Sequence, residues 1–166
     1  MSLPRISVLM VCMGNICRSP TAEGLLRQKL IEAGLTHEVA VDSAGTLGSH
    51  AGAPPDERAQ SHALQRGIDI SALRARQIQR RDFERFDLLL AMDEDNLATL
   101  MRLCPPGHER RVRLMMDFAS RQDSPSTEVP DPYYGGPAGF ATVLDLLDDA
   151  CSGLVEHLRH QVGGTS

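Results

Sequence analysis

Residues 6–20 constrain the fold more than any other part of the chain. The apolar run that ends at Val11 is partly β-branched, which indicates a short buried strand. Ser19 and Pro20 then indicate the start of a helix, a capping hydroxyl followed by proline at the first helical position. The loop between them therefore connects the carboxyl end of a strand to the amino end of a helix. There, free backbone N–H groups and the helix dipole favour an anion.

The loop itself, within VCMGNICRSP (11–20), combines residue types that suit phosphoryl transfer. Gly14 allows the backbone to approach a ligand, and Asn15 tolerates left-handed geometry. The field of the helix favours the thiolate form of Cys12, which can act as a nucleophile. Arg18 adds a planar fork of donors matched to phosphate oxygens. A buried cysteine in a simple turn would not need this combination, and the Gly-Lys-Ser/Thr ending of a nucleotide-binding loop is absent.

Strand and helix patterns alternate along the rest of the chain. We expect further strands at 39–44, 87–92 and 112–115, and helices at 20–33, 56–66, 93–104 and 138–162. This alternation predicts an α/β fold, in which a four-stranded parallel sheet has helices on both faces. Ligands bind such sheets beyond the carboxyl ends of the strands, which is where the Cys12 loop lies.

Length and composition narrow the class of protein. The 166 residues suffice for one domain over 1–166, with 163–166 as a loose tail. A net charge of −5 and a pI near 5.6 argue against a nucleic-acid or membrane-surface binder. The apolar run 6–13 is too short for a signal peptide or a membrane span, and the four cysteines form no CxxC motif. We therefore expect a cytoplasmic, reduced protein, and the scattered histidines predict no metal site.

Phosphoryl transfer also needs an acid to protonate the leaving oxygen. Only eleven residues precede Cys12, so the acid must come from further along the chain. Asp131 is the strongest candidate, because it lies between two prolines that stiffen the loop and is followed by Tyr133 and Tyr134, the only two tyrosines. If Asp131 is instead structural, Glu23 or Asp93 becomes the candidate acid.

These segments resemble the signature of the low-molecular-weight protein tyrosine phosphatases. The resemblance begins with VCMGNICRSP and includes the general-acid segment DPYY (131–134). Later landmarks of the family are similar to DSAG (42–45), PDERA (55–59), RARQ (74–77) and AMDEDN (91–96). The resemblance implies a sheet with strand order 2-1-3-4, which composition and periodicity do not determine.

The resemblance also implies a role for each matching position. Cys12 attacks phosphorus and forms a phosphocysteine, while Arg18 and the backbone amides hold the phosphate oxygens. Asp131 protonates the leaving phenolate and then deprotonates the water that hydrolyses the intermediate. The loop residues at the phosphate are Met13, Gly14, Asn15, Ile16 and Cys17. No cofactor is implied, and the partners are phosphotyrosine proteins or small aryl phosphates, bound by a monomer or weak dimer.

A second set of residues supports the loop or contacts the aryl group. Ser19 matches the hydroxyl that the family uses to hydrogen-bond the thiolate. Asn15 and Ser43 match a polar network that holds the loop in shape, and we add Glu23 as a supporting residue. The residues expected around the aryl ring are Ile16, Tyr133, Tyr134, Ser49 and His50.

Two positions depart from the family pattern. Many members place an aromatic residue near position 49, where Ser49 and His50 stand here. Several also have a histidine before RARQ that is tied into the network around Asn15, and here that position is Leu73. The first departure bears on substrate preference, and the second bears on how the network around Asn15 holds the phosphate-binding loop.

Three other functions compete with a tyrosine phosphatase. A protein-arginine phosphatase resembles this loop but has a threonine where Ile16 stands. An arsenate reductase needs a second cysteine pair, and only Cys104 and Cys151 remain, both on apolar helix stripes. A phosphate-binding module without turnover would not need Cys12, Arg18 and Asp131 together.

Cys17 has two interpretations. It can trap an oxidised Cys12 as a disulfide, which predicts a redox-sensitive enzyme, or it can simply pack beneath the loop.

The stretch 71–86 is the most basic part of the chain. It contains five arginines, and we expect them on a solvated face, paired with acids such as Asp82 and Glu84.

Overall fold

A four-stranded parallel sheet forms the centre of the computed structural model, which describes residues 4–120, 128–132 and 137–163. The strand order is β2-β1-β3-β4, so the predicted order 2-1-3-4 is confirmed. The strands are β1 Ile6–Cys12, β2 Val39–Gly45, β3 Leu88–Ala91 and β4 Val112–Leu114. Because the winding reverses at β1, a crevice lies beyond its carboxyl end, at Cys12.

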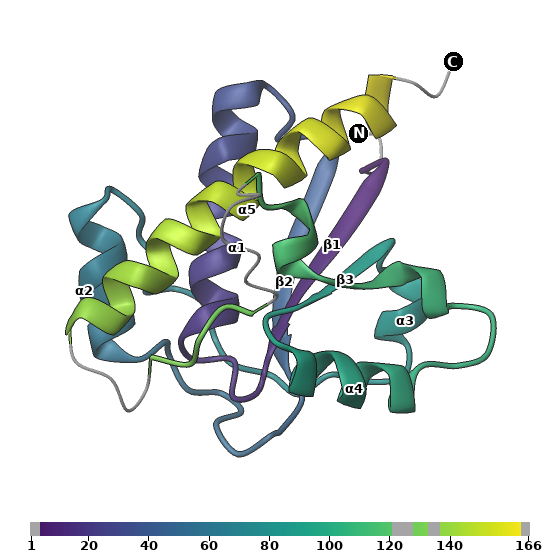
Figure 1. The fold of residues 1–166 in the computed structure, drawn as a ribbon, viewed down its shortest axis with the longest axis horizontal. Helices are drawn as coiled ribbons and strands as arrows, with labels where there is room; N and C mark the ends of the chain where they lie inside the picture. The colour runs from purple at the N-terminus through teal and green to yellow at the C-terminus, as the bar shows by residue number, and fades with distance from the viewer. Residues whose placement is uncertain (1–3, 121–127, 133–136, 164–166) are drawn as a thin grey trace.

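Helices cover both faces of this sheet, as predicted (Figure 1). On one face lie α1, α2 and α5, and on the other lie α3 and α4. Their bounds are α1 Arg18–Ala33, α2 Glu57–Gln65, α3 Asp82–Arg85, α4 Glu94–Leu103 and α5 Pro137–Gly163. No helix within the described ranges is long and apolar enough to cross a membrane.

Alternate residues of β1 contribute to two separate cores. Val8 and Met10 belong to the cluster beneath α1 and α5, whereas Leu9 and Val11 belong to the cluster beneath α3 and α4. All four side chains are fully buried. Burial on both faces explains why this strand is a continuous apolar run and not an alternating one.

Most helix ends follow the capping residues of the sequence. Gly34 ends α1 in the left-handed conformation, with φ of 73°. Asp56 caps α2, since its carboxylate accepts the backbone N–H groups of Arg58 and Ala59. The prediction that Ser19 caps the first helix is wrong, because α1 begins at Arg18 and the Ser19 hydroxyl makes no capping bond. That hydroxyl lies at the active-site loop instead.

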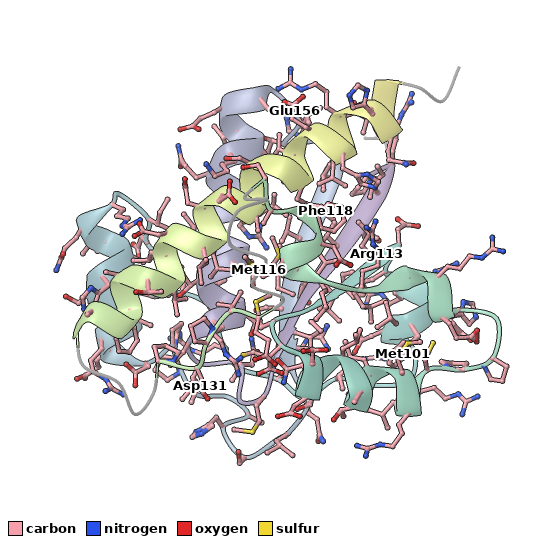
Figure 2. All side chains as sticks on the ribbon, in the orientation of Figure 1. Met101, Arg113, Met116, Phe118, Asp131 and Glu156 are labelled. Atoms are coloured by element: carbon pink, nitrogen blue, oxygen red, sulfur yellow. The ribbon has the colours of Figure 1, made fainter. Side chains whose placement is uncertain are left out.

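Two 3₁₀ helices that the sequence patterns did not predict flank β4. They are η1 Glu109–Arg111 and η2 Met115–Phe118. Within η2, the Phe118 backbone carbonyl approaches α5 so closely that a Cβ at Gly153 would collide with it. The Arg113 guanidinium lies 4.5 Å from the centroid of the Phe118 ring, and both side chains are labelled in Figure 2. These contacts fix the last helix against the sheet.

Candidate active site

A cavity of about 180 Å³ lies beyond the carboxyl end of β1. Its lining residues are Cys12, Met13, Gly14, Ile16, Cys17, Arg18, His50 and Asp131. The structure therefore brings together the three residues that the sequence predicted as catalytic. A larger hollow of about 710 Å³ lies along β2 and the end of α1, but neither a thiol nor a carboxylate lines it.

The loop at the floor of this cavity has one strained residue and one tight approach. Asn15 has φ of 58°, the left-handed geometry that its residue type predicted. Its side-chain oxygen accepts the backbone N–H of Arg76 at 3.0 Å, which holds it in place. At Gly45, a Cβ would lie 2.7 Å from the Met13 carbonyl oxygen, closer than real atoms allow. Only glycine at this end of β2 lets the loop lie against it.

The Cys12 side chain is 3% exposed and has two hydrogen-bond partners. Its sulfur lies 2.9 Å from the Ser19 hydroxyl oxygen, and the backbone N–H of Asn15 donates to it at 3.3 Å. The predicted contact between Ser19 and Cys12 is therefore present in the structure. Both partners can stabilise negative charge on the sulfur.

A continuous chain of hydrogen bonds runs from Cys12 to a buried carboxyl group. The Asn15 side-chain amide donates to Ser19 Oγ at 2.8 Å and to Ser43 Oγ at 3.0 Å. Ser43 in turn donates to Glu23 Oε1 at 2.7 Å. Because the Asn15 amide can only donate, the Ser19 hydroxyl hydrogen is left available for Cys12 Sγ. The network predicted for Asn15 and Ser43 is present, and it extends to Glu23.

Glu23 lies at the far end of this chain and is 2% exposed. Burial raises the pKa of Glu23 above its ordinary value. The hydrogen bonds from Ser43 and Arg27 and the charge of Arg27 favour the carboxylate, but they do not cancel the effect of burial. Arg27 Nη2 lies 2.7 Å from Glu23 Oε2 and also donates to the Val41 carbonyl. The sequence analysis did not identify Arg27, although its spacing of four residues from Glu23 on α1 is a signal for such a pair.

Arg18 is 3% exposed and is held by residues from two other segments. Its Nη1 donates to Asp93 Oδ2 at 2.6 Å and to the Val129 carbonyl at 3.0 Å. Burial opposes the charge on Arg18, but nearby Cys12 and Asp93 outweigh it and hold the pKa of the guanidinium above its ordinary value. The role of Asp93 was missed. The available signal was its position just after β3, the strand beside β1.

Asp131 reaches the cavity from the segment 128–132. Its Oδ2 lies 3.8 Å from Arg18 Nη2, and its side chain is 37% exposed. The segment is anchored by the Val129 N–H, which donates to the Met92 carbonyl at 2.7 Å. Figure 2 shows Asp131 near the carboxyl end of β1. The other predicted residues of this segment, Tyr133 and Tyr134, lie outside the described residues.

The rim of the cavity differs from the prediction at one position. His50 lines the cavity, and a Cβ at Gly14 would lie 3.1 Å from its ring. Ser49, which the sequence analysis placed at the aryl wall, is exposed and does not line the cavity. The side chain of the next residue, His50, lies at that wall, although both residues belong to the same exposed turn. Met13 and Ile16 complete the apolar part of the rim.

The second cysteine of the loop, Cys17, also lines the cavity and is 6% exposed. Burial raises the pKa of its thiol to about 12, and the negative charges of Asp56 and Cys12 add to the effect. The remaining cysteines lie elsewhere. Burial raises the pKa of Cys151 to about 12, and Cys104 is half-buried at the end of α4. At neutral pH Cys17 is therefore a protonated thiol beside Cys12.

The site offers a sulfur, a guanidinium and a carboxylate around one small cavity. Such a set suits a tetrahedral oxyanion, with the sulfur below it and the carboxylate at the rim. Within the described ranges, no three histidine, cysteine or acidic side chains come close enough together to hold a metal ion.

Comparison with known proteins gives a consistent result. The family model for low molecular weight phosphotyrosine protein phosphatases matches residues 7–163. A low molecular weight protein-tyrosine-phosphatase from Streptomyces coelicolor is 41% identical over 95% of this chain and 96% of that protein. The crystal structure of a protein tyrosine phosphatase from Entamoeba histolytica has a TM-score of 0.89 and 39% identity, over 94% of this chain and 98% of that one. A Drosophila arginine phosphatase has a TM-score of 0.83 at 30% identity, over 91% and 96% of the two chains.

Proposed function

Because the chain belongs to the low molecular weight phosphotyrosine protein phosphatase family, we propose that it hydrolyses phosphotyrosine through a phosphocysteine on Cys12. The observation that carries this proposal is the meeting of Cys12, Arg18 and Asp131 at one cavity of about 180 Å³. Cys12 and Arg18 belong to one loop, and Asp131 joins them from a segment more than one hundred residues later in the chain. A purely structural cysteine would not need the other two beside it.

In the first step, the Cys12 sulfur attacks phosphorus, so a P–S bond forms as the P–O bond to the phenol breaks. Asp131 gives its proton to the departing phenolate oxygen. Arg18 and the N–H groups at the start of α1 bind the phosphate oxygens, on which charge is spread in the transition state. Asp93 keeps the Arg18 guanidinium turned toward the cavity, since its Oδ2 accepts from Arg18 Nη1.

In the second step, water attacks phosphorus and the P–S bond breaks. Asp131, now a carboxylate, accepts a proton from that water. The sulfur leaves as a thiolate, and the Ser19 hydroxyl at 2.9 Å stabilises this charge. Inorganic phosphate and the free enzyme are the products, and no cofactor takes part.

The apolar rim supports an aryl substrate over the two enzymatic alternatives. Ile16 stands where the arginine-phosphatase branch has threonine, and it contacts a phenol ring better than a guanidinium. An arsenate reductase would need a cysteine pair to relay electrons. Neither Cys104 nor Cys151 lines the cavity, and Cys151 is fully buried. We therefore propose phosphotyrosine proteins, or small aryl phosphates, as substrates.

Turnover of p-nitrophenyl phosphate by the purified protein tests this proposal, alongside phosphotyrosine, phosphoarginine and arsenate. We expect hydrolysis of both aryl phosphates in the presence of a metal chelator, with much slower release of phosphate from phosphoarginine. Binding of phosphate without turnover would instead establish a non-catalytic module. A preference for phosphoarginine, or arsenate reduction, would assign one of the other two activities.

A further inference from the structure

A second hollow, of about 500 Å³, lies beside the active site. The two spaces share one loop, because His50 lines the catalytic cavity and the adjacent Ala51 lines the second hollow. This loop is fixed in place, since the Gly52 N–H donates to the Ala75 carbonyl at 2.8 Å and the Ala75 N–H donates to the Ala53 carbonyl at 2.9 Å. A peptide bound in the cavity can therefore leave it across the loop toward the second hollow.

Three arginines line this second hollow, and among the described residues only one of the three has acidic partners. Arg76 forms ion pairs with Asp42 at 3.1 Å and with Asp82 at 3.0 Å, which is part of what the sequence predicted for this stretch. Arg81 and Arg85 are exposed, and neither forms an ion pair with any residue that the structure describes. The expected pairing of the whole basic stretch with nearby acids is therefore only partly present.

Arg81 and Arg85 lie one helical turn apart, at either end of α3. Like charges at this spacing repel each other, so the two side chains gain nothing from being neighbours, although the Arg85 guanidinium also lies 5.8 Å from the centroid of the Phe86 ring. The two acids of the hollow are already occupied, because Asp42 and Asp82 also accept the backbone N–H groups of Ser43 and Gln79. The hollow therefore keeps a net positive charge on a chain whose own net charge is −5.

We propose that Arg81 and Arg85 bind acidic side chains that flank the phosphotyrosine of a protein substrate. This inference rests on the proposed function and adds a substrate class to it, namely phosphotyrosine within an acidic sequence. Guanidinium groups pair well with carboxylates, and charged groups at the edge of an interface mainly change the rate of association. A small aryl phosphate does not reach this hollow, so its hydrolysis does not depend on these arginines.

The test compares two phosphotyrosine peptides of equal length, one with glutamates around the phosphotyrosine and one with glutamines at the same positions. We expect the wild-type protein to show a kcat/KM roughly fivefold higher for the acidic peptide at low salt, and less of a preference as salt is added. The double variant Arg81→Glu/Arg85→Glu should lose or reverse this preference. Its activity on p-nitrophenyl phosphate should stay within about twofold of wild type.

The matched control is Arg102→Glu/Arg110→Glu, which changes the net charge by the same amount. Arg102 is exposed at the C-terminal end of α4, away from the active-site end of that helix, and Arg110 is exposed on η1. This control should keep the peptide preference. If the glutamate variant folds poorly, Arg81→Gln/Arg85→Gln is measured in its place.

Each outcome separates the inference from the proposed function. Equal kcat/KM for the two peptides in the wild-type protein, or a preference that survives in both arginine variants, overturns the inference and leaves the phosphatase intact. Loss of the preference in the remote control also overturns it, since the effect would then come from net charge alone. Inhibition of peptide hydrolysis by RNA that depends on Arg81 and Arg85 would assign the hollow to nucleic acid instead. Failure of the wild-type protein to hydrolyse p-nitrophenyl phosphate contradicts the proposed function itself.

Discussion

The floor and the rim of the catalytic cavity are built in different ways. At the floor, Cys12, Asn15 and Ser19 are at most 3% exposed and are joined by hydrogen bonds of 2.8 to 3.3 Å. At the rim, Met13 is 47% exposed and the Asp131 side chain 37%. Asn96 Oδ1 is the single buried side-chain oxygen or nitrogen without a partner in the described chain, and it belongs to α4, outside the floor.

Because of this difference, the floor and the rim should respond differently to substitution. A buried, fully paired network holds its groups in one geometry, and loss of any member disturbs the others. An exposed rim side chain can move and can be exchanged at a lower cost to the rest. We therefore expect changes at the floor to affect every substrate alike, and changes at the rim to depend on which substrate is used.

The largest effect should come from removal of the floor nucleophile. In Cys12→Ser, we expect turnover of every aryl phosphate to fall by at least about 10³-fold, because both steps pass through the sulfur. Binding of vanadate or phosphate should persist, since Arg18 and the amides remain. Steady-state kinetics and calorimetry measure the two effects, and Cys104→Ser serves as the control at a cysteine outside the cavity. Activity within tenfold of wild type would contradict the proposed mechanism.

At the rim, Asp131→Asn should depend strongly on the leaving group. We expect a loss of about 10²-fold on phosphotyrosine and a much smaller loss on an ester of an activated phenol, which needs little protonation. Measurement of kcat for a series of aryl phosphates gives the slope against leaving-group pKa, with Asp145→Asn on α5 as the control. A uniform loss across the series would make Asp131 structural and leave Asp93 or Glu23 as the acid.

A third change tests whether the floor extends as far as Glu23. In Glu23→Gln, the new side-chain amide can donate to Ser43, which already accepts from Asn15, so the Ser43 hydroxyl would lose its carboxylate acceptor and the support of Asn15 would weaken. We expect kcat/KM to fall roughly fivefold on all substrates, the value of about one hydrogen bond. The exposed Glu32→Gln on the same helix is the control.

The thermal stability of Glu23→Gln distinguishes an effect on the hydrogen-bond network from a folding defect. Burial raises the pKa of Glu23, so its carboxylate costs stability at neutral pH, and that cost disappears as the pH falls toward the ordinary carboxyl range. A neutral glutamine side chain at this position avoids the cost but loses the ion pair with Arg27. We therefore expect Tm at neutral pH to change by no more than about 3 °C. A large fall in Tm together with the loss of activity would mean that Glu23 acts only in folding.

The smallest effect on basal activity is expected at Cys17. Peroxide converts the Cys12 thiolate to sulfenic acid, and attack by Cys17 would then form a disulfide and release water. In Cys17→Ser, activity should stay within about twofold of wild type, but the fraction that dithiothreitol restores after peroxide should fall. Mass spectrometry should find Cys12 as sulfinic or sulfonic acid.

The pH dependence of this recovery follows from the raised pKa of Cys17. Because that pKa is about 12, the reactive thiolate fraction of Cys17 rises about tenfold per pH unit through the neutral range, so trapping should be faster in more alkaline buffer. The same recovery with and without Cys17 would leave only the interpretation that this residue packs beneath the loop.

The sequence was most informative where the interacting groups are close along the chain. Cys12, Asn15 and Arg18 fall within seven consecutive residues, so strand, loop and helix signals were enough to predict their meeting. Asp93 and Gly45 meet the loop only because β3 and β2 align in parallel beside β1. No local pattern gives that alignment, and the strand order came from resemblance to a family.

One error has a specific physical reason. Ser19 was predicted as a helix cap because its residue type favours that position, but its hydroxyl contacts Cys12 and Asn15 instead, and α1 starts at Arg18, two residues earlier than predicted. Both Ser49 and His50 were expected near the aryl group from a family position, and of the two the structure places His50 at the cavity.

The two oxygens of Asp93 link the site to a neighbouring helix. Oδ1 accepts the backbone N–H of Asn96 at the start of α4, while Oδ2 accepts from Arg18. One carboxylate thus serves both the first turn of α4 and the phosphate-binding guanidinium. When a bound oxyanion fixes Arg18, Asp93 is fixed as well, so local unfolding of the first turn of α4 should become less frequent, by thermodynamic linkage. Hydrogen exchange at the Asn96 amide should therefore slow on addition of phosphate or vanadate, so that a backbone proton outside the cavity reports its occupancy.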